Sequence, residues 1–97
     1  MSKLVIQGIE FSYVHGAEFE NTQVGIKVMS HENDNTTVWI VKSFSYDIYV
    51  KGTTPEEALE RYVQGVYDFI RKCERKIFEL NEELNEIQSL RVTRGEE

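Results

Sequence analysis

The side chains best suited to covalent or metal chemistry in this 97-residue chain are a single cysteine, Cys73, and two histidines, His15 and His31. A cysteine becomes a nucleophile when a nearby histidine or cation lowers its pKa, and zinc needs several closely placed ligands. Both histidines fall in segments that we predict to be loops, far from Cys73 in sequence. Cys73 itself belongs to an apolar helical pattern. We therefore predict a buried, unreactive thiol, no catalytic residues, no metal site and no cofactor.

Motifs that bind phosphate or activate a nucleophile are also absent from the sequence. It contains no glycine-rich phosphate loop, no nucleophile elbow and no His-Glu-x-x-His helix. Carboxylates are numerous but dispersed, so no pair can be singled out as a general acid and base. We expect a protein that is not an enzyme.

The charge balance argues against nucleic acid as the ligand. Eleven Lys and Arg residues stand against 17 Asp and Glu residues, for a formal net charge of −6, and affinity for nucleic acid comes largely from cations that neutralise phosphates. A basic block comprises Arg71, Lys72, Arg75 and Lys76. An acidic block follows it directly and comprises Glu79, Glu82, Glu83 and Glu86. We interpret both blocks as a solvated or interchain-paired helix face rather than a phosphate site.

Length and composition indicate one folded domain, residues 1–97, in the cytoplasm. The content of hydrophobic residues, 40%, is too high for a disordered chain, and one cysteine cannot form an intramolecular disulfide. No apolar run approaches the roughly 20 residues of a membrane helix. The first residues, Met-Ser-Lys before a strand-like segment, do not resemble a signal peptide. We expect a soluble protein with no membrane partner.

The first half, residues 1–51, has the alternating apolar pattern of an antiparallel sheet with three or four strands. The alternation over residues 3–14 changes phase at Gly8, where we predict a bulge within one strand. We predict an acidic loop over residues 17–22, a strand over residues 23–30 and a polar turn over residues 32–35. Residues 36–51 are either a hairpin, turning near Lys42 and Ser43, or one long bent strand.

The pattern of the second half predicts one long helix, residues 54–92, followed by a frayed acidic tail, residues 93–97. Thr54 can cap the free amides of the first turn, Pro55 suits the first helical position, and Glu57 completes a capping box. The predicted fold is therefore α+β, with an antiparallel sheet packed on one long C-terminal helix.

Apolar residues in this helix recur at alternating spacings of four and three, the heptad repeat of a coiled coil. They are Leu59, Val63, Val66, Ile70, Cys73, Ile77, Leu80, Leu84 and Ile87. A helix of about 37 residues is roughly 55 Å long, twice the roughly 27 Å length of an eight-residue strand. About half of the helix must therefore extend past the sheet, and its stripe needs a second chain to cover it.

We predict that this stripe forms a dimer seam. The seam residues are Ile70, Cys73, Ile77, Leu80, Leu84 and Ile87, with Lys76 and Glu83 beside them. In an antiparallel pair centred near Phe78, the basic block of each chain faces the acidic block of the other, so an antiparallel homodimer is our first expectation. A parallel dimer or higher oligomer, and a monomer or a complex with a different chain, remain open alternatives.

A second apolar surface is predicted on the sheet. If Val24, Ile26, Val28, Phe44, Tyr46, Ile48 and Val50 face the helix, the opposite face carries Met29, Tyr49 and one parity of the third strand. That parity is Trp39 with Val41 or Val38 with Ile40. We predict a partner-binding surface formed by Met29, Trp39, Val41 and Tyr49, since Trp, Tyr and Met are common interface anchors.

Residues 39–66 resemble the HicB-like antitoxin domain, in which a short meander leads through a turn into a helix that begins Thr-x-Glu-Glu-Ala-Leu. The matching residues are Gly52, Thr53, Thr54, Pro55, Glu56, Glu57, Ala58 and Leu59. The resemblance implies a small sheet-and-helix antitoxin that binds a toxin ribonuclease.

Together these features predict a non-enzymatic regulator or inhibitor, of the kind encoded by phages and mobile elements, that acts as a homodimer on a protein partner. Three alternatives remain open: a HicB-like antitoxin, a structural oligomerisation subunit, and an oligomer that sequesters a small molecule.

Overall fold

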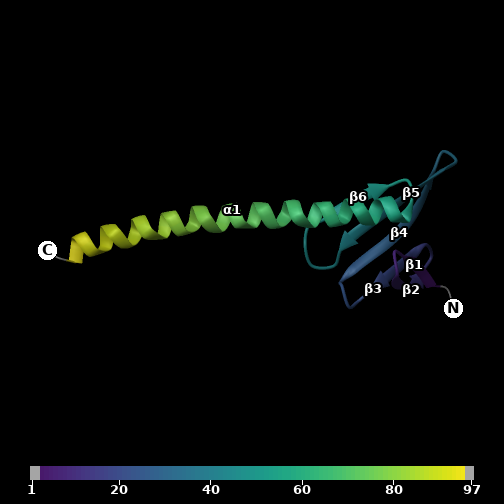
Figure 1. Ribbon diagram of the computed structural model, residues 1–97, viewed down its shortest axis with the longest axis horizontal. Helices are drawn as coiled ribbons and strands as arrows, with labels where there is room; N and C mark the ends of the chain where they lie inside the picture. The colour runs from purple at the N-terminus through teal and green to yellow at the C-terminus, as the bar shows by residue number, and fades with distance from the viewer. Residues whose placement is uncertain (1–2, 96–97) are drawn as a thin grey trace. The chain divides into compact units, whose positions relative to one another are not determined.

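The computed structural model of the protein describes residues 3–95, which contain six strands and one long helix (Figure 1). The strands are β1 (Lys3–Ile6), β2 (Ile9–His15), β3 (Glu18–Asn21), β4 (Ile26–Asn33), β5 (Thr36–Ser43) and β6 (Tyr49–Gly52), and the helix is α1 (Pro55–Gly95). The chain divides into two compact units, Met1–Tyr67 and Asp68–Glu97. We call the first the sheet unit and the second the tail.

The predicted α+β class, with an antiparallel sheet and a long C-terminal helix, is confirmed. The strand count is corrected, because the described residues contain six strands where three or four were expected. The strands pair in chain order, each antiparallel to the next, and form a curled meander at the start of α1 (Figure 1).

The bulge predicted near Gly8 is wrong, because a tight hairpin separates β1 from β2 at this point. Ile6 pairs with Ile9 across a two-residue turn. Gln7 and Gly8 in that turn both have positive φ, 51° and 83°, as the hairpin turn that matches strand twist requires. A two-residue turn changes the alternation phase just as a bulge does, which is why the sequence pattern suggested one long strand.

The acidic loop predicted over residues 17–22 is also corrected, since most of it is the short strand β3. The side-chain oxygen of Asn21 accepts hydrogen bonds from the backbone N–H groups of Gln23 and Val24, at 2.8 and 3.0 Å. This Asx turn and the positive φ of Gly25, 70°, reverse the chain into β4. The predicted strand over residues 23–30 therefore begins only at Ile26.

The polar turn predicted over residues 32–35 is confirmed at Asp34 and Asn35, which have φ angles of 51° and 66° between β4 and β5. Of the two alternatives for residues 36–51, the hairpin is correct, because β5 and β6 pair antiparallel with Lys42 opposite Tyr49. The connection lies at residues 44–48, later than the expected turn at Lys42 and Ser43.

The core lies between the inner face of the sheet and the first turns of α1. Its buried apolar cluster comprises Ile6, Phe11, Ile26, Val28, Val41, Ala58 and Leu59. Gly52 allows the closest approach, because a Cβ at this position would lie 2.6 Å from the backbone nitrogen of Ala58. Each large side chain buried here contributes roughly 1.5–3 kcal/mol, so the sheet unit has a core of its own.

The predicted start of the helix is confirmed by its hydrogen bonds. The Thr54 hydroxyl accepts a bond from the backbone N–H of Glu57 at 3.0 Å. The Glu57 carboxylate accepts bonds from the backbone N–H and the hydroxyl of Thr53, at 2.6 and 2.9 Å. These two bonds, and more weakly the positive charge of Arg61, lower the pKa of Glu57 from its ordinary value of 4.5.

The helix runs to Gly95, three residues past its predicted end, and residues 96–97 of the predicted acidic tail lie outside the described residues. Over residues 3–95, no helix combines the length and the apolar content needed to cross a membrane.

Candidate protein-interaction surfaces

The first candidate surface is the dimer seam on the tail. Every described side chain from Ile70 to Arg91 is exposed. The large apolar side chains there are 45–65% exposed: Ile70, Ile77, Phe78, Leu80, Leu84, Ile87 and Leu90. Cys73, which we expected to be buried, is likewise exposed.

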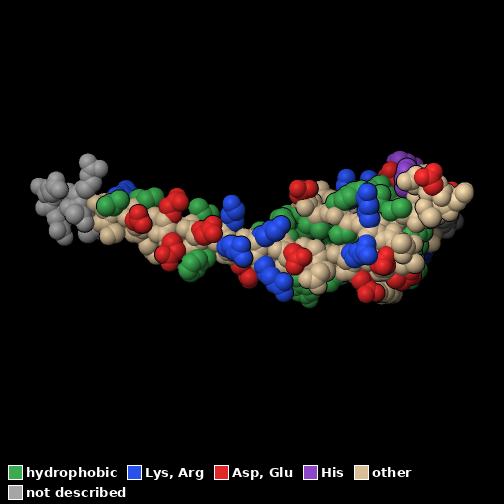
Figure 2. Space-filling view, turned by 90° about the horizontal axis from the view of Figure 1, so that it is seen from above, with side chains coloured by type: hydrophobic (Ala, Val, Ile, Leu, Met, Phe, Trp, Pro, Cys, Tyr) green, Lys and Arg blue, Asp and Glu red, His purple; other side chains and the backbone are tan. Residues whose placement is uncertain are grey.

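The two charged blocks of the tail are exposed beside the seam. Figure 2 shows a cluster of lysine and arginine side chains and, nearer the C-terminal end of the helix, a stretch where acidic side chains predominate. Arg71 pairs with Asp68 at 3.4 Å, but among the described residues no ion pair joins the basic block to the acidic block. Lys76 and Glu83 are therefore available for ion pairs with another chain.

The second candidate surface is the outer face of the sheet, and its predicted membership must be corrected. Val41 is fully buried in the core opposite Val28, and Trp39 packs against the same core while only partly buried. Neither residue can belong to the outer face. Since side chains alternate along a strand, the outer face of β5 instead carries Val38, Ile40 and Lys42, the parity that we did not choose.

Met29 and Tyr49 share the outer face as predicted. Met29 lies directly opposite Ile40, and Tyr49 lies directly opposite Lys42. Directly opposed residues of an antiparallel pair project to the same side of the sheet. The register therefore places Met29, Ile40, Lys42 and Tyr49 together on one face.

Three residues expected to face the helix are exposed instead: Val24, Phe44 and Tyr46. Val24 lies in the turn before β4, and Phe44 and Tyr46 lie in the loop between β5 and β6. Sequence reasoning assigned the two aromatic residues to a strand and so did not consider them for binding. The available signal was the run Ser43, Ser45 and Asp47, because Ser and Asp favour turns over strand interiors.

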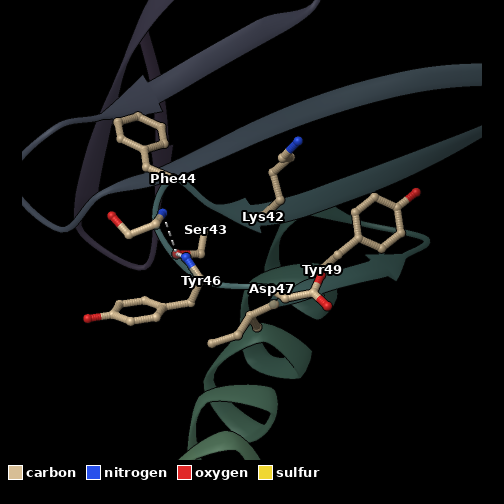
Figure 3. Close-up of a pocket in the computed structure, with 8 residues that line it drawn as sticks. Lys42, Ser43, Phe44, Tyr46, Asp47 and Tyr49 are labelled. Atoms are coloured by element: carbon tan, nitrogen blue, oxygen red, sulfur yellow. Dashed lines mark hydrogen bonds between the residues drawn. The ribbon is translucent and has the colours of Figure 1, made fainter.

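Backbone and side-chain hydrogen bonds hold the loop of residues 44–48 in place. The Ser43 hydroxyl accepts bonds from the backbone N–H groups of Ser45 and Tyr46, at 3.1 and 3.0 Å (Figure 3). The backbone N–H of Phe44 donates to the carbonyl of Gly25 at 2.9 Å, and that of Ser43 donates to the carbonyl of Ile48 at 3.0 Å. The loop thus presents its aromatic side chains from an ordered backbone.

Two open hollows lie beside this loop. The first has a volume of about 480 Å³ and is lined by residues 42–49. The second, about 360 Å³, is lined by Glu20, Lys27, Lys42, Ser43 and Phe44. Figure 3 shows Phe44 and Tyr46 on one side of the first hollow and Lys42 and Tyr49 on the other.

The lysines of the outer face differ in their partners. Lys27 forms an ion pair with Glu18 at 3.2 Å, and the Nζ of Lys51 lies 6.0 Å from the ring centroid of Tyr49. Lys42 forms no ion pair with any carboxylate in the described part of the chain. Within residues 3–95, no group of three or more His, Cys, Asp and Glu side chains could hold a metal ion.

No family model, curated protein or solved structure matches this chain. The resemblance of residues 39–66 to HicB-like antitoxins therefore stays a prediction. The surfaces described above are the basis for a functional proposal.

Proposed function

We propose that this protein is a non-enzymatic regulator or inhibitor that binds a protein partner and works as an antiparallel homodimer. The observation that carries the proposal is the exposed seam on the tail, which has six heptad-spaced residues from Ile70 to Ile87. Soluble proteins rarely expose a continuous apolar stripe unless another molecule covers it.

The energetics favour a second chain over an unpaired tail. Most helix stability in proteins comes from the packing of an apolar face rather than from intrinsic helix propensity. Burial of the apolar seam side chains contributes roughly 1.5–3 kcal/mol for each large residue. Because the large seam residues are still 45–60% exposed in the single chain, about half of that gain remains for association, and over two seams it offsets the roughly 4–15 kcal/mol lost in association.

Charge order favours the antiparallel arrangement. When the pair is centred near Phe78, Cys73 meets Leu84 of the other chain, Ile77 meets Leu80, and Ile70 meets Ile87. Lys76 then faces Glu83, both being exposed and without an ion pair within the described chain. Each exposed pair contributes at most about 1 kcal/mol, so the charges select the orientation while the seam supplies the affinity.

The native cysteine allows a direct test of this orientation. In the antiparallel pair the two Cys73 residues are eleven positions out of register, or about 16 Å along the helix, which is too far for a disulfide. In the Leu84→Cys variant, Cys73 and the new thiol of the other chain share a layer. We expect this variant to form covalent dimers under mild oxidation and the unmodified protein to form none. Efficient Cys73–Cys73 crosslinking of the unmodified protein would indicate a parallel pair.

Light scattering at two concentrations tests the dimer itself. The double variant Leu80→Asp with Leu84→Asp should be a folded monomer, because it places charges in the seam and leaves the core of the sheet unit intact. Phe78→Ala is the matched control, since Phe78 is exposed but lies outside the heptad seam. A protein that is monomeric before any substitution would contradict the proposal.

Affinity capture from the native host, followed by mass spectrometry, tests the regulatory role. A captured toxin ribonuclease would favour the HicB-like alternative, and capture of a defence complex would favour an inhibitor. Recovery of this chain alone, from both wild-type and monomeric baits, would favour a structural oligomerisation subunit.

A further inference from the structure

We infer that the outer face of the sheet unit, centred on Lys42 and the loop of residues 44–48, binds an acidic peptide segment of the partner protein. This inference deepens the proposed function, because it names a surface and the chemistry that the surface recognises. It rests on the proposed function only in requiring a protein partner, and it does not depend on the dimer seam.

Exposed aromatic side chains form the apolar part of this surface. Phe44, Tyr46 and Tyr49 lie within six residues of one another and are 46–63% exposed. Aromatic residues are enriched at protein interfaces and dominate their binding energy. The loop that carries Phe44 and Tyr46 is already ordered by the bonds to Ser43, so binding would require little further ordering of the backbone.

The two hollows give the surface a shape suited to a peptide. Lys42, Ser43 and Phe44 line both hollows and so form a wall between them. Side chains two residues apart in an extended peptide point to the same side, so an extended segment would place one side chain on each side of this wall. Small-molecule sites are usually more enclosed than these hollows.

The charge of Lys42, which has no ion pair within the described residues, favours an acidic partner. Lys42 lies directly opposite Lys27 on the outer face, and like charges at directly opposed positions destabilise a sheet. Glu18 pairs with Lys27, but within the described residues no carboxylate pairs with Lys42. A carboxylate from a partner, bound beside Lys42, would relieve the repulsion between the two lysines.

The acidic residues around the hollows argue against nucleic acid as the occupant. Asp47 lines the first hollow and Glu20 lines the second. A polynucleotide carries a phosphate at every nucleotide, and these phosphates would be repelled by Asp47 and Glu20. The net charge of the protein, −6, adds to this repulsion. A peptide can instead place its carboxylates selectively beside Lys42 and its apolar side chains against Phe44.

The test uses a display library of random dodecapeptides selected on the full chain. We expect enriched peptides that combine Asp or Glu with apolar residues. The best of these peptides, titrated as a synthetic probe, should bind at least tenfold more weakly to Lys42→Glu and to Phe44→Ala. Lys3→Glu is the matched control and should bind as the wild type does, because it changes an exposed lysine on β1, at the opposite edge of the sheet.

Any of three results would overturn the inference: no enriched peptide, enriched peptides without carboxylates, or binding unaffected by Lys42→Glu. A single-stranded oligonucleotide of fifteen thymidines that binds the wild type but not Lys42→Glu would also overturn it. The Lys42→Gln variant, whose thermal melt should match that of the wild type, separates loss of charge from loss of folding.

The same titration on the monomeric Leu80→Asp with Leu84→Asp variant separates this inference from the proposed dimer. Peptide binding should persist at wild-type affinity in that variant. If the unmodified chain is monomeric but binds the acidic peptide, the dimer is wrong and this inference holds. If it is dimeric but selects no acidic peptide, only this inference fails.

Discussion

The two parts of α1 share one apolar spacing but differ in what covers it. In the sheet unit, Ala58 and Leu59 are buried against the sheet, and Tyr62 packs beside them. In the tail the same heptad spacing continues from Ile70 to Ile87, yet every described side chain from Ile70 to Arg91 is exposed. Spacing alone therefore does not reveal whether a helical stripe is covered by its own chain or by another.

The width of the apolar face is the more informative property. Near the start of the helix, Ala58 and Tyr62 widen the stripe beyond the heptad positions, as expected for a helix on a sheet. Past Cys73 the stripe narrows to the heptad positions with few additions, which suits a second helix. The narrowing begins a few residues after Tyr67, where the sheet unit ends.

The largest expected effect compares a core residue with a tail residue of the same type. Phe11→Ala should lower the free energy of unfolding by about 3–5 kcal/mol, because Phe11 is fully buried. Phe78→Ala should change it by less than about 0.5 kcal/mol, because Phe78 is 65% exposed. Urea denaturation followed by circular dichroism measures both. Equal losses would show that the tail is packed as tightly as the core.

The next largest effect contrasts the two glycines near the sheet–helix contact. Gly52→Ala should cost about 1–3 kcal/mol, because its Cβ would meet the backbone of Ala58 at 2.6 Å. At Gly65 a Cβ would be in ordinary contact with Ile48, at 3.4 Å, and alanine favours the helix. Gly65→Ala should therefore be neutral or stabilise the protein by up to about 1 kcal/mol. Thermal denaturation measures both effects. Equal melting temperatures of the two variants would refute the close packing at Gly52.

A smaller effect is expected from the helix cap. Thr54→Ala removes the acceptor for the backbone N–H of Glu57 and should cost about 1 kcal/mol of unfolding free energy. Because the cap belongs to the sheet unit, the dimer measured by light scattering should persist. Loss of both stability and dimerisation would mean that the two units unfold as one.

The smallest effect should appear only as a pH dependence. The lowered pKa of Glu57 means that folding favours the ionised carboxylate, so this stabilisation is present above about pH 4.5 and is lost as the pH falls through the folded-state pKa. We expect Glu57→Gln to melt below the wild type at pH 7 and the difference to shrink toward pH 3. Arg61→Gln is the control, since it removes the weaker charge contribution and should show a smaller difference. A difference in melting temperature between Glu57→Gln and the wild type that stays constant from pH 7 to pH 3 would show that ionisation of Glu57 is not its cause.

How far the sequence predicted the fold depended on how local each signal was. The helix cap and the Asp34–Asn35 turn are encoded by neighbouring residues, and both were predicted correctly. The two-residue turn at Gly8 was missed, because a change in the phase of apolar alternation can come from a bulge or from a tight turn. Strand β3 was missed because Phe19 is its only large apolar residue, which is too little for a periodic pattern.

The prediction of which residues lie on the outer face failed for a different reason. Val38, Trp39, Ile40 and Val41 are four consecutive large apolar residues, so alternation gives no indication of which parity points inward. Pairing of Val41 with Val28 decides the question, and that pairing joins residues distant in sequence. Met29 was correctly assigned to the outer face because Lys27 separates the apolar residues Ile26 and Val28, so the alternation of this strand shows which parity points inward.

The chain-order pairing of the strands has a consequence for how the protein is made. Each strand needs only its sequence neighbour, so the closing loops are short and the contact order is low for a sheet, which favours rapid folding. Synthesis proceeds from the N-terminus, so β1 to β6 and the first turns of α1 emerge before the seam. Each new chain can thus complete its core on the ribosome before it gains the surface with which it would pair.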